Sequence, residues 1–157
     1  MPTVVSGLAS QWQATPTIAT VNEFIHALEF PFTPEQERAF RLIAEHSVSK
    51  HVENLRMYIG GPGGTGKSYV IASLDRFFSS TGQQRRFRLC SYTGVAANNI
   101  AGMTLHSALC LGSVPLAKIN AVTSQDLIAM WDGVDYLFID EVSMIGCAFL
   151  YRVSQAL

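Results

Sequence analysis

The chain has 157 residues, of which 48% are hydrophobic and 15% are charged, so it is long enough to fold around its own core. Lys and Arg number 11 against 12 Asp and Glu, and the net charge of -1 excludes a whole-protein basic footprint for nucleic acid. No apolar run reaches the roughly 18 residues that a membrane-spanning helix needs, so no membrane contact is expected.

The N-terminal stretch is predicted to be a leader followed by a helix. Residues 1–20 are rich in Ser, Thr, Ala and Gln without a clear hydrophobic period, which indicates a flexible leader. Residues 21–157 are predicted to form the folded lobe. Its first helix is expected to begin at Thr20, because Thr20 and Glu23 have the spacing of a capping box.

A second helix and a glycine-rich loop follow. Thr33 is the predicted N-cap of this helix, with Pro34 at its first position and Gln36 three residues after the cap. Residues 56–59 are predicted to form a buried strand that runs directly into the loop. After the loop, a further helix is predicted from the spacing of the apolar residues Val70, Ile71, Leu74, Phe77 and Phe78.

The rest of the chain alternates strands and helices, which predicts an α/β fold with a mainly parallel central sheet. The basic cluster of Arg85, Arg86 and Arg88 fits either a solvated turn before a strand or a local phosphate patch. The predicted elements are a turn at 81–84, a strand at 87–92, one or two short helices within 93–112, a helix at 124–130, a strand at 136–139 and a helix that continues to the C-terminus.

The glycine-rich loop has the spacing G-x-x-x-x-G-K-[ST] of a phosphate-binding loop, or P-loop. Its glycines let main-chain N–H groups turn toward phosphate oxygens, and the following helix adds a positive dipole end. We predict that Lys67 contacts the β- and γ-phosphates of ATP and that the Ser68 hydroxyl binds Mg²⁺. The alternative is a chance glycine-rich turn, which the strand before it and the helix after it disfavour. The loop residues are Gly61, Pro62, Gly63, Gly64, Thr65, Gly66, Lys67 and Ser68.

A second motif places two carboxylates after an apolar strand. Asp140 and Glu141 follow residues 137–139, and ligands of open α/β sheets collect at the carboxyl ends of the strands. We predict that Asp140 holds the Mg²⁺ shell and that Glu141 orients and deprotonates the attacking water, which makes Lys67, Asp140 and Glu141 the catalytic residues. An ordinary strand end is the alternative, but the pairing with the P-loop favours the catalytic interpretation.

Five stretches in a fixed order point to a more specific family. They are residues 32–36, 61–68, 91–100, 102–107 and 139–144, and the Thr-Gly-x-Ala-Ala run followed by Gly-x-Thr-x-His-Ser is the discriminating part. Together they resemble the Pif-type DNA helicases of superfamily 1, which include the helicase domains of Helitron transposons. The resemblance covers about residues 32–157 and implies the N-terminal lobe of a P-loop NTPase with a RecA-like three-layer sandwich.

The resemblance also assigns roles to single residues. Gln36 is similar to the family's adenine-reading glutamine, although it equally fits a capping box with Thr33. Tyr69, directly after the loop, joins the predicted nucleotide-binding residues. A buried histidine and threonine helix caps are open alternatives for part of the predicted single-stranded DNA track. That track comprises Thr93, Gly94, Thr104, His106 and Ser107.

The resemblance implies an ATP-dependent 5′-to-3′ DNA helicase with ATP and Mg²⁺ as cofactors and single-stranded DNA as partner, acting in DNA repair, recombination and telomere maintenance. No counterpart of the family's second lobe, with its arginine at the γ-phosphate, precedes Leu157. We therefore expect a fragment that hydrolyses ATP very slowly and does not unwind duplex. A non-unwinding nucleotide-binding or regulatory module is the alternative. A small P-loop phosphotransferase is disfavoured because the sequence shows no Arg-rich lid.

Three widely separated cysteines without C-x-x-C spacing disfavour a zinc site and a disulfide framework, and they fit a reducing compartment. No Lys or Arg precedes Arg38, which argues against an Arg-rich transit peptide and a secretory signal. The resemblance implies the nucleus, with the mitochondrion as the alternative, and the sequence makes no prediction of oligomeric state.

Overall fold

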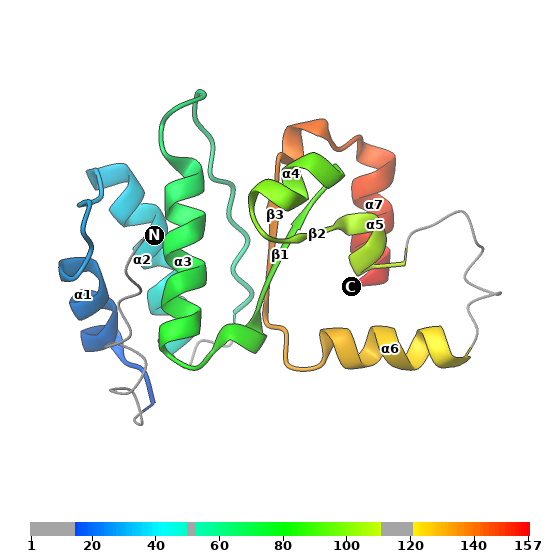
Figure 1. Cartoon of the computed structure of the whole chain (residues 1–157), viewed down its shortest axis with the longest axis horizontal. Coiled ribbons are helices and arrows are strands. Elements are labelled where there is room, and N and C mark those ends of the chain that lie inside the picture. Colours follow the sequence, from blue (N-terminus) through cyan, green and yellow to red (C-terminus); the bar gives the residue numbers. More distant parts are fainter. Residues whose placement is uncertain (1–14, 50–52, 111–120) are drawn as a thin grey trace, which may run out of the picture. The chain divides into compact units, whose positions relative to one another are not determined.

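The computed structural model describes residues 15–49, 53–110 and 121–157 (Figure 1). The chain divides into two compact units, Met1–Gln84 and Arg85–Leu157, and each unit is described by itself. In the described part of the chain, no helix combines the length and the apolar character that crossing a membrane requires.

The first unit is built from helices around an aromatic core. Its helices are α1 (Ile18–His26), α2 (Pro34–Val48) and α3 (Lys67–Ser80). The rings of Phe24 and Phe40 stack with centroids 5.4 Å apart, and Phe77 meets them edge-on at 5.4 and 5.7 Å. Val70, Leu74 and Phe77 are buried at the predicted helical spacing. Each such side chain stabilises the fold by about 1.5–3 kcal/mol, so α3 is anchored directly behind the glycine-rich loop.

The sequence predicts the N-cap of α2 correctly and the N-cap of α1 wrongly. Thr33 caps α2 as predicted, because its hydroxyl accepts a hydrogen bond from the Gln36 N–H at 3.4 Å. The prediction that α1 begins at Thr20 is wrong, since the N-cap is Thr17 and its N–H donates to the Thr20 hydroxyl at 3.0 Å. Residues 18–20 of the predicted leader are therefore helical, and residues 1–14 lie outside the described residues.

The predicted strand at residues 56–59 is absent. Residues 54–62 form neither helix nor strand, and the side chains of Leu55, Met57 and Tyr58 are 37%, 38% and 76% exposed. A strand needs a neighbour to accept and donate its main-chain hydrogen bonds. Among the described residues, all strands belong to the second unit. Despite its apolar composition, this segment therefore has no neighbouring strand within the first unit.

The second unit contains a three-stranded parallel sheet in the order β2-β1-β3. Its strands are β1 (Phe87–Ser91), β2 (Met103–Thr104) and β3 (Tyr136–Asp140). In register, Ser91 pairs with Thr104 on one side and with Asp140 on the other. The carboxyl ends of all three strands therefore meet at one edge of the sheet, which is where ligands collect in parallel α/β folds.

Helices follow each of these strands and confirm the predicted α/β class. Figure 1 shows them as α4 (Gly94–Asn99), α5 (Leu105–Ala108), α6 (Ala121–Trp131) and α7 (Cys147–Ala156), and short 3₁₀ turns lie at Gln84–Arg86 and Val142–Met144. The strands predicted at 87–92 and 136–139 and the helices after them are confirmed. Strand β2 was missed because two residues are too few to show a period. Residues 111–120, including the end of the predicted 93–112 block, lie outside the described residues.

The basic triplet at the start of β1 makes contacts within the second unit. Arg85 pairs with the Asp132 carboxylate at 2.9 Å, and Arg86 pairs with Asp135. Arg88 donates to the main-chain oxygen of Met130. These partners lie at the end of α6 and in the turn before β3. Arg85 and Arg86 thus lie at an exposed turn directly before β1, as the first alternative predicted, and the side chains of the triplet also make contacts within the unit.

Cys90 lies at the centre of the core of the second unit, beside Leu105, Ala108, Leu109 and Val153. Burial raises the pKa of its thiol from 9.0 to about 11. A neutral thiol at physiological pH is a poor nucleophile, so Cys90 serves packing.

The raised pKa predicts a loss of stability in alkali. Below pH 9 the Cys90 thiol is protonated in both states and contributes no pH dependence. Between pH 9 and about 11 the unfolded chain loses this proton first, so the free energy of unfolding falls by about 1.4 kcal/mol per pH unit. Urea unfolding of the wild type and Cys90→Ala should show a constant difference below pH 9 that shifts in favour of the variant above it. Parallel curves up to pH 11 would contradict the assignment.

Candidate functional site

The glycine-rich loop leads into α3 through two glycines with left-handed backbone. Gly64 and Gly66 both have φ of +79°, a conformation that other residues adopt only with strain. Gly66 is the N-cap of α3 and offers no side chain to the first turn. The positive end of the helix dipole is therefore available to an anion, as a phosphate-binding loop requires.

Lys67 lies over the loop that precedes it. Its ammonium group donates to the main-chain oxygens of Gly61 and Pro62, both at 2.8 Å. The Thr65 hydroxyl also donates to the Pro62 oxygen, at 2.9 Å. An ammonium has three donors, so two are used by the loop and one lies outside these bonds. The single cation of the motif is thus held at the loop itself.

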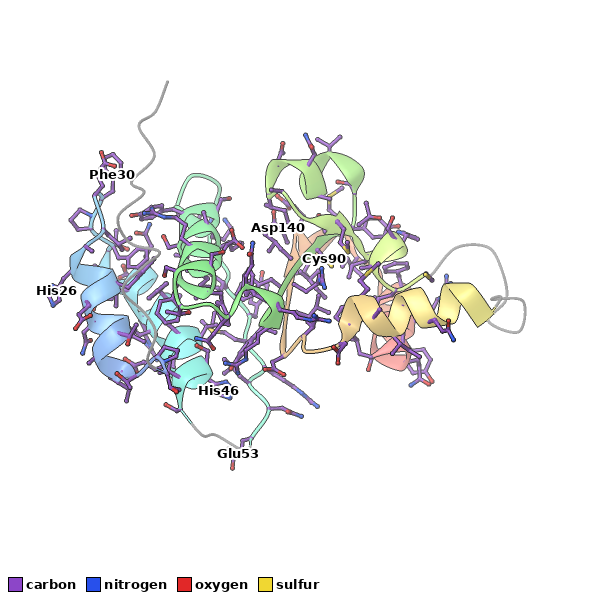
Figure 2. The ribbon with its side chains drawn as sticks, turned by 60° about the horizontal axis from the view of Figure 1, so that its bottom comes forward. His26, Phe30, His46, Glu53, Cys90 and Asp140 are labelled. Carbon is purple, nitrogen blue, oxygen red and sulfur yellow. The ribbon has the colours of Figure 1, made fainter. Side chains whose placement is uncertain are left out.

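Gln36 and Tyr69 connect α2 and its preceding segment to the loop region. The Gln36 side-chain oxygen accepts from the Thr33 N–H at 3.0 Å, and its nitrogen donates to the Thr65 main-chain oxygen at 3.1 Å. The Tyr69 hydroxyl donates to the main-chain oxygen of Phe30, which Figure 2 labels. The capping interaction of Gln36 is therefore observed, and its contact with adenine stays a prediction.

The acidic pair lies at the carboxyl edge of the sheet in the second unit. Asp140 is the last residue of β3, beside Ser91 on β1, whose hydroxyl donates to the Asp140 main-chain oxygen at 3.3 Å. Figure 2 labels Asp140 together with Cys90 of the neighbouring strand. Glu141 follows with an exposed side chain and a left-handed backbone, φ 54° and ψ 41°. Strained backbone at a non-glycine residue is a feature of functional sites.

The strained backbone at Glu141 predicts that glycine at this position stabilises the fold. Replacing Glu141 by glycine is expected to raise the free energy of unfolding by about 1 kcal/mol, because glycine adopts positive φ without strain. Ser143 is exposed and has no positive φ, so Ser143→Gly should instead lower stability by about 0.5–1 kcal/mol. Urea unfolding measures both changes, and equal destabilisation by the two glycines would show that Glu141 is not strained.

The predicted DNA track lies at the same sheet edge and contains two helix caps. Thr93 caps α4 by accepting from the Ala96 N–H at 3.2 Å. Thr104 caps α5 by accepting from the Ser107 N–H at 3.1 Å, and its hydroxyl donates to that of Ser107 at 2.9 Å. Gly94 is the first residue of α4. The capping alternative is therefore observed for both threonines, and contact with DNA stays a prediction for all of these residues.

His106 is exposed, so the alternative of a buried histidine is wrong. Its ring lies 4.5 Å from that of Phe149 and 5.7 Å from that of Tyr92, and the Phe149 and Tyr92 rings meet edge-on at 5.3 Å. Neither Tyr92 nor Phe149 is among the residues that the sequence predicts for this track. Phe149 is 43 positions from His106 in the chain, so no local pattern joins the two residues.

The structure thus assembles the predicted residues in two groups. Unit 1 brings the loop together with Gln36 and Tyr69, and unit 2 brings Asp140 and Glu141 to the sheet edge that carries Thr93 and Thr104. A family model described as PIF1-like helicase matches residues 31–155, which is well over half of the chain and spans both groups. The chain belongs to the PIF1-like helicase family. The fold is accordingly that of an α/β P-loop NTPase of the RecA-like type.

Individual relatives of the PIF1-like family agree with this assignment. The chain is similar to the ATP-dependent DNA helicase RRM3 of Saccharomyces cerevisiae, with 32% identity over 127 residues, which are 78% of this chain and 17% of the relative. Its identity to the ATP-dependent DNA helicase PIF1 is 35% in Danio rerio and 34% in Mus musculus, in each case over 62% of this chain and 15% of the relative. The chain spans less than a fifth of the length of these relatives. No solved structure matches it significantly.

Mg²⁺ suits the oxygen ligands that this PIF1-like chain offers when a triphosphate supplies further oxygen ligands. Among the described residues, no group of three or more His, Cys, Asp or Glu side chains could hold a metal ion alone. Mg²⁺ commonly takes only one or two protein ligands and completes its shell with phosphate oxygens and water. The Ser68 hydroxyl in the first unit and the Asp140 carboxylate in the second are each hard oxygen donors of the kind that magnesium prefers.

Proposed function

We propose that the chain is the nucleotide-binding motor lobe of an ATP-dependent DNA helicase that moves 5′-to-3′ on single-stranded DNA. The observation that carries this proposal is the loop at the start of α3, where two left-handed glycines, an uncapped helix start and the Lys67 ammonium meet in one segment. Membership of the PIF1-like helicase family supports DNA as the partner.

In the proposed reaction, each residue acts on a different part of Mg-ATP. Lys67 moves its ammonium from the loop carbonyls to the β- and γ-phosphates. Ser68 and Asp140 would hold Mg²⁺, which neutralises the charge that develops on the phosphates. Glu141 accepts a proton from water as the water oxygen bonds to the γ-phosphorus. The bond from that phosphorus to the β–γ bridging oxygen breaks, and ADP and phosphate leave.

The proposed DNA track combines hydroxyl groups and one aromatic cluster. Thr93 and Thr104 lie at the carboxyl edge of the sheet, and small hydroxyls of this kind suit contacts with strand phosphates. His106 is exposed beside Tyr92 and Phe149, and rings of this kind stack on unpaired bases without reading sequence. We assign the helicase to DNA repair, recombination and telomere maintenance in the nucleus on the strength of the family resemblance.

A second candidate function is a nucleotide-binding module without DNA movement. The net charge of -1 favours it, as does the pairing of Arg85 and Arg86 with Asp132 and Asp135, because a nucleic-acid surface usually needs unpaired cations. The two functions differ in whether ATP and single-stranded DNA influence each other's binding.

Fluorescence anisotropy with a labelled single-stranded oligonucleotide separates the two candidates. The motor lobe predicts salt-sensitive binding that changes when Mg-ATP is added, and weaker binding by Thr104→Val and His106→Ala. Ile128→Ala is the matched control, because this exposed side chain lies outside the predicted track. Failure to bind the oligonucleotide at low salt, with Mg-ATP still bound, would leave only the nucleotide-binding module.

A further inference from the structure

The Gln36 side chain makes two hydrogen bonds that join α2 to the glycine-rich loop. Its oxygen accepts from the Thr33 N–H at 3.0 Å, which fixes the amide to the start of α2. Its nitrogen donates to the main-chain oxygen of Thr65 at 3.1 Å, 29 positions along the chain. The amide is therefore a direct bridge between the first turn of a helix and the turn that precedes Lys67.

The Gln36 amide occupies the space beside Gly66 that a side chain at this position would fill. A Cβ atom added to Gly66 would come within 2.3 Å of the Gln36 nitrogen, much closer than real contacts allow. Gly66 also has φ of +79°, which other residues adopt only with strain. Glycine is thus favoured at position 66 by its backbone conformation, and its missing side chain leaves the space that the Gln36 amide fills.

The chain segment that precedes Gln36 is itself held in place by side-chain contacts. The Tyr69 hydroxyl on α3 donates to the main-chain oxygen of Phe30. The Phe32 ring lies 5.3 Å from the Tyr69 ring and 5.2 Å from the ring of the fully buried Phe40. The segment before α2 is therefore held both to the helix that follows the loop and to the core, so the amide has a rigid support.

We propose that Gln36 is a positioning residue for the phosphate loop, which holds the Thr65–Gly66 turn in the conformation that grips the triphosphate. This inference rests on the proposed function for the class of ligand. It goes beyond reading adenine, because a residue that recognises only the base has no effect on a ligand without one. A residue that positions the loop affects the phosphate chain itself.

Inorganic tripolyphosphate separates the two roles, because it carries the phosphates of ATP and no base. Calorimetric titration of the full chain with Mg-tripolyphosphate is expected to show roughly 3- to 10-fold weaker binding for Gln36→Met, which keeps the length of the side chain and removes both hydrogen bonds. Thr33→Ala is the matched control. It removes the hydroxyl that caps α2 and leaves the main-chain N–H that orients Gln36, so its affinity for tripolyphosphate should equal that of the wild type.

Two results would overturn the proposal. If Gln36→Met bound Mg-ATP weakly and Mg-tripolyphosphate like the wild type, Gln36 would act on the base alone. If Gln36→Met and Thr33→Ala weakened tripolyphosphate binding equally, loss of the helix cap would be the whole effect.

A second measurement tests the positioning role without any ligand. NMR order parameters of the Gly64 and Gly66 amides are expected to fall in Gln36→Met, from near 0.85 toward 0.6, and to stay at the wild-type value in Thr33→Ala. If the wild type bound neither ATP nor tripolyphosphate, the proposed function would fail. The order parameters would then decide the positioning role separately, and unchanged values in Gln36→Met would refute it.

Discussion

Replacing Lys67 by alanine is expected to weaken the binding of Mg-ATP by about 100-fold or more. Hydrogen bonds from a charged group each contribute about 1.5–3 kcal/mol, and the ammonium is proposed to contact two phosphates. In the structure it already lies on the loop, 2.8 Å from the main-chain oxygens of Gly61 and Pro62. The variant therefore loses the cation together with two bonds that shape the loop. Isothermal titration calorimetry of the full chain measures the change.

Arg38→Ala is the matched control for Lys67→Ala. Arg38 is an exposed cation in the same unit, on α2, and it belongs to no part of the predicted site. Its removal changes the net charge equally, so it should leave the affinity for Mg-ATP close to that of the wild type. Equal losses in the two variants would attribute the effect to net charge and would contradict a specific role for Lys67.

Replacing Glu141 by glutamine is expected to lower the residual rate of ATP hydrolysis by about 100- to 10,000-fold while leaving the binding of Mg-ATP intact. Glutamine keeps the shape of the side chain but cannot accept a proton from the attacking water, and general bases contribute about this factor. The measurements are phosphate release for the rate and calorimetry for the affinity, with Glu35→Gln as a control at an exposed carboxylate on α2. Weaker binding with unchanged turnover would refute Glu141 as the base.

The parts of the fold that the sequence predicted well depend on local patterns. The cap of α2 by Thr33, the helix that begins at Lys67 and the strand before Asp140 each involve residues within a few positions of one another. Their geometry follows from capping chemistry and hydrophobic period. The start of α1 was misplaced by three residues because Thr17 and Thr20 are both acceptable caps, and the sequence pattern favoured the wrong one.

The features that the sequence could not supply depend on distant partners. Residues 56–59 have the composition of a strand, but strand formation depends on a neighbouring strand that composition does not reveal. The contact between His106 and Phe149 joins residues far apart in the chain. The bridge from Gln36 to Thr65 likewise crosses 29 positions, so the sequence suggested the cap and the contact with adenine but not the support of the loop.

The most direct test of the proposed motor lobe follows the loop amides while Mg-ATP is added to the full chain. NMR titration is expected to shift the amide signals of Gly63, Gly64 and Gly66 first and most strongly, with saturation at one ATP per chain. Main-chain N–H groups that turn toward phosphate oxygens produce this pattern. Binding of Mg-ATP with these three signals unmoved, or no binding at millimolar concentration, would contradict the account.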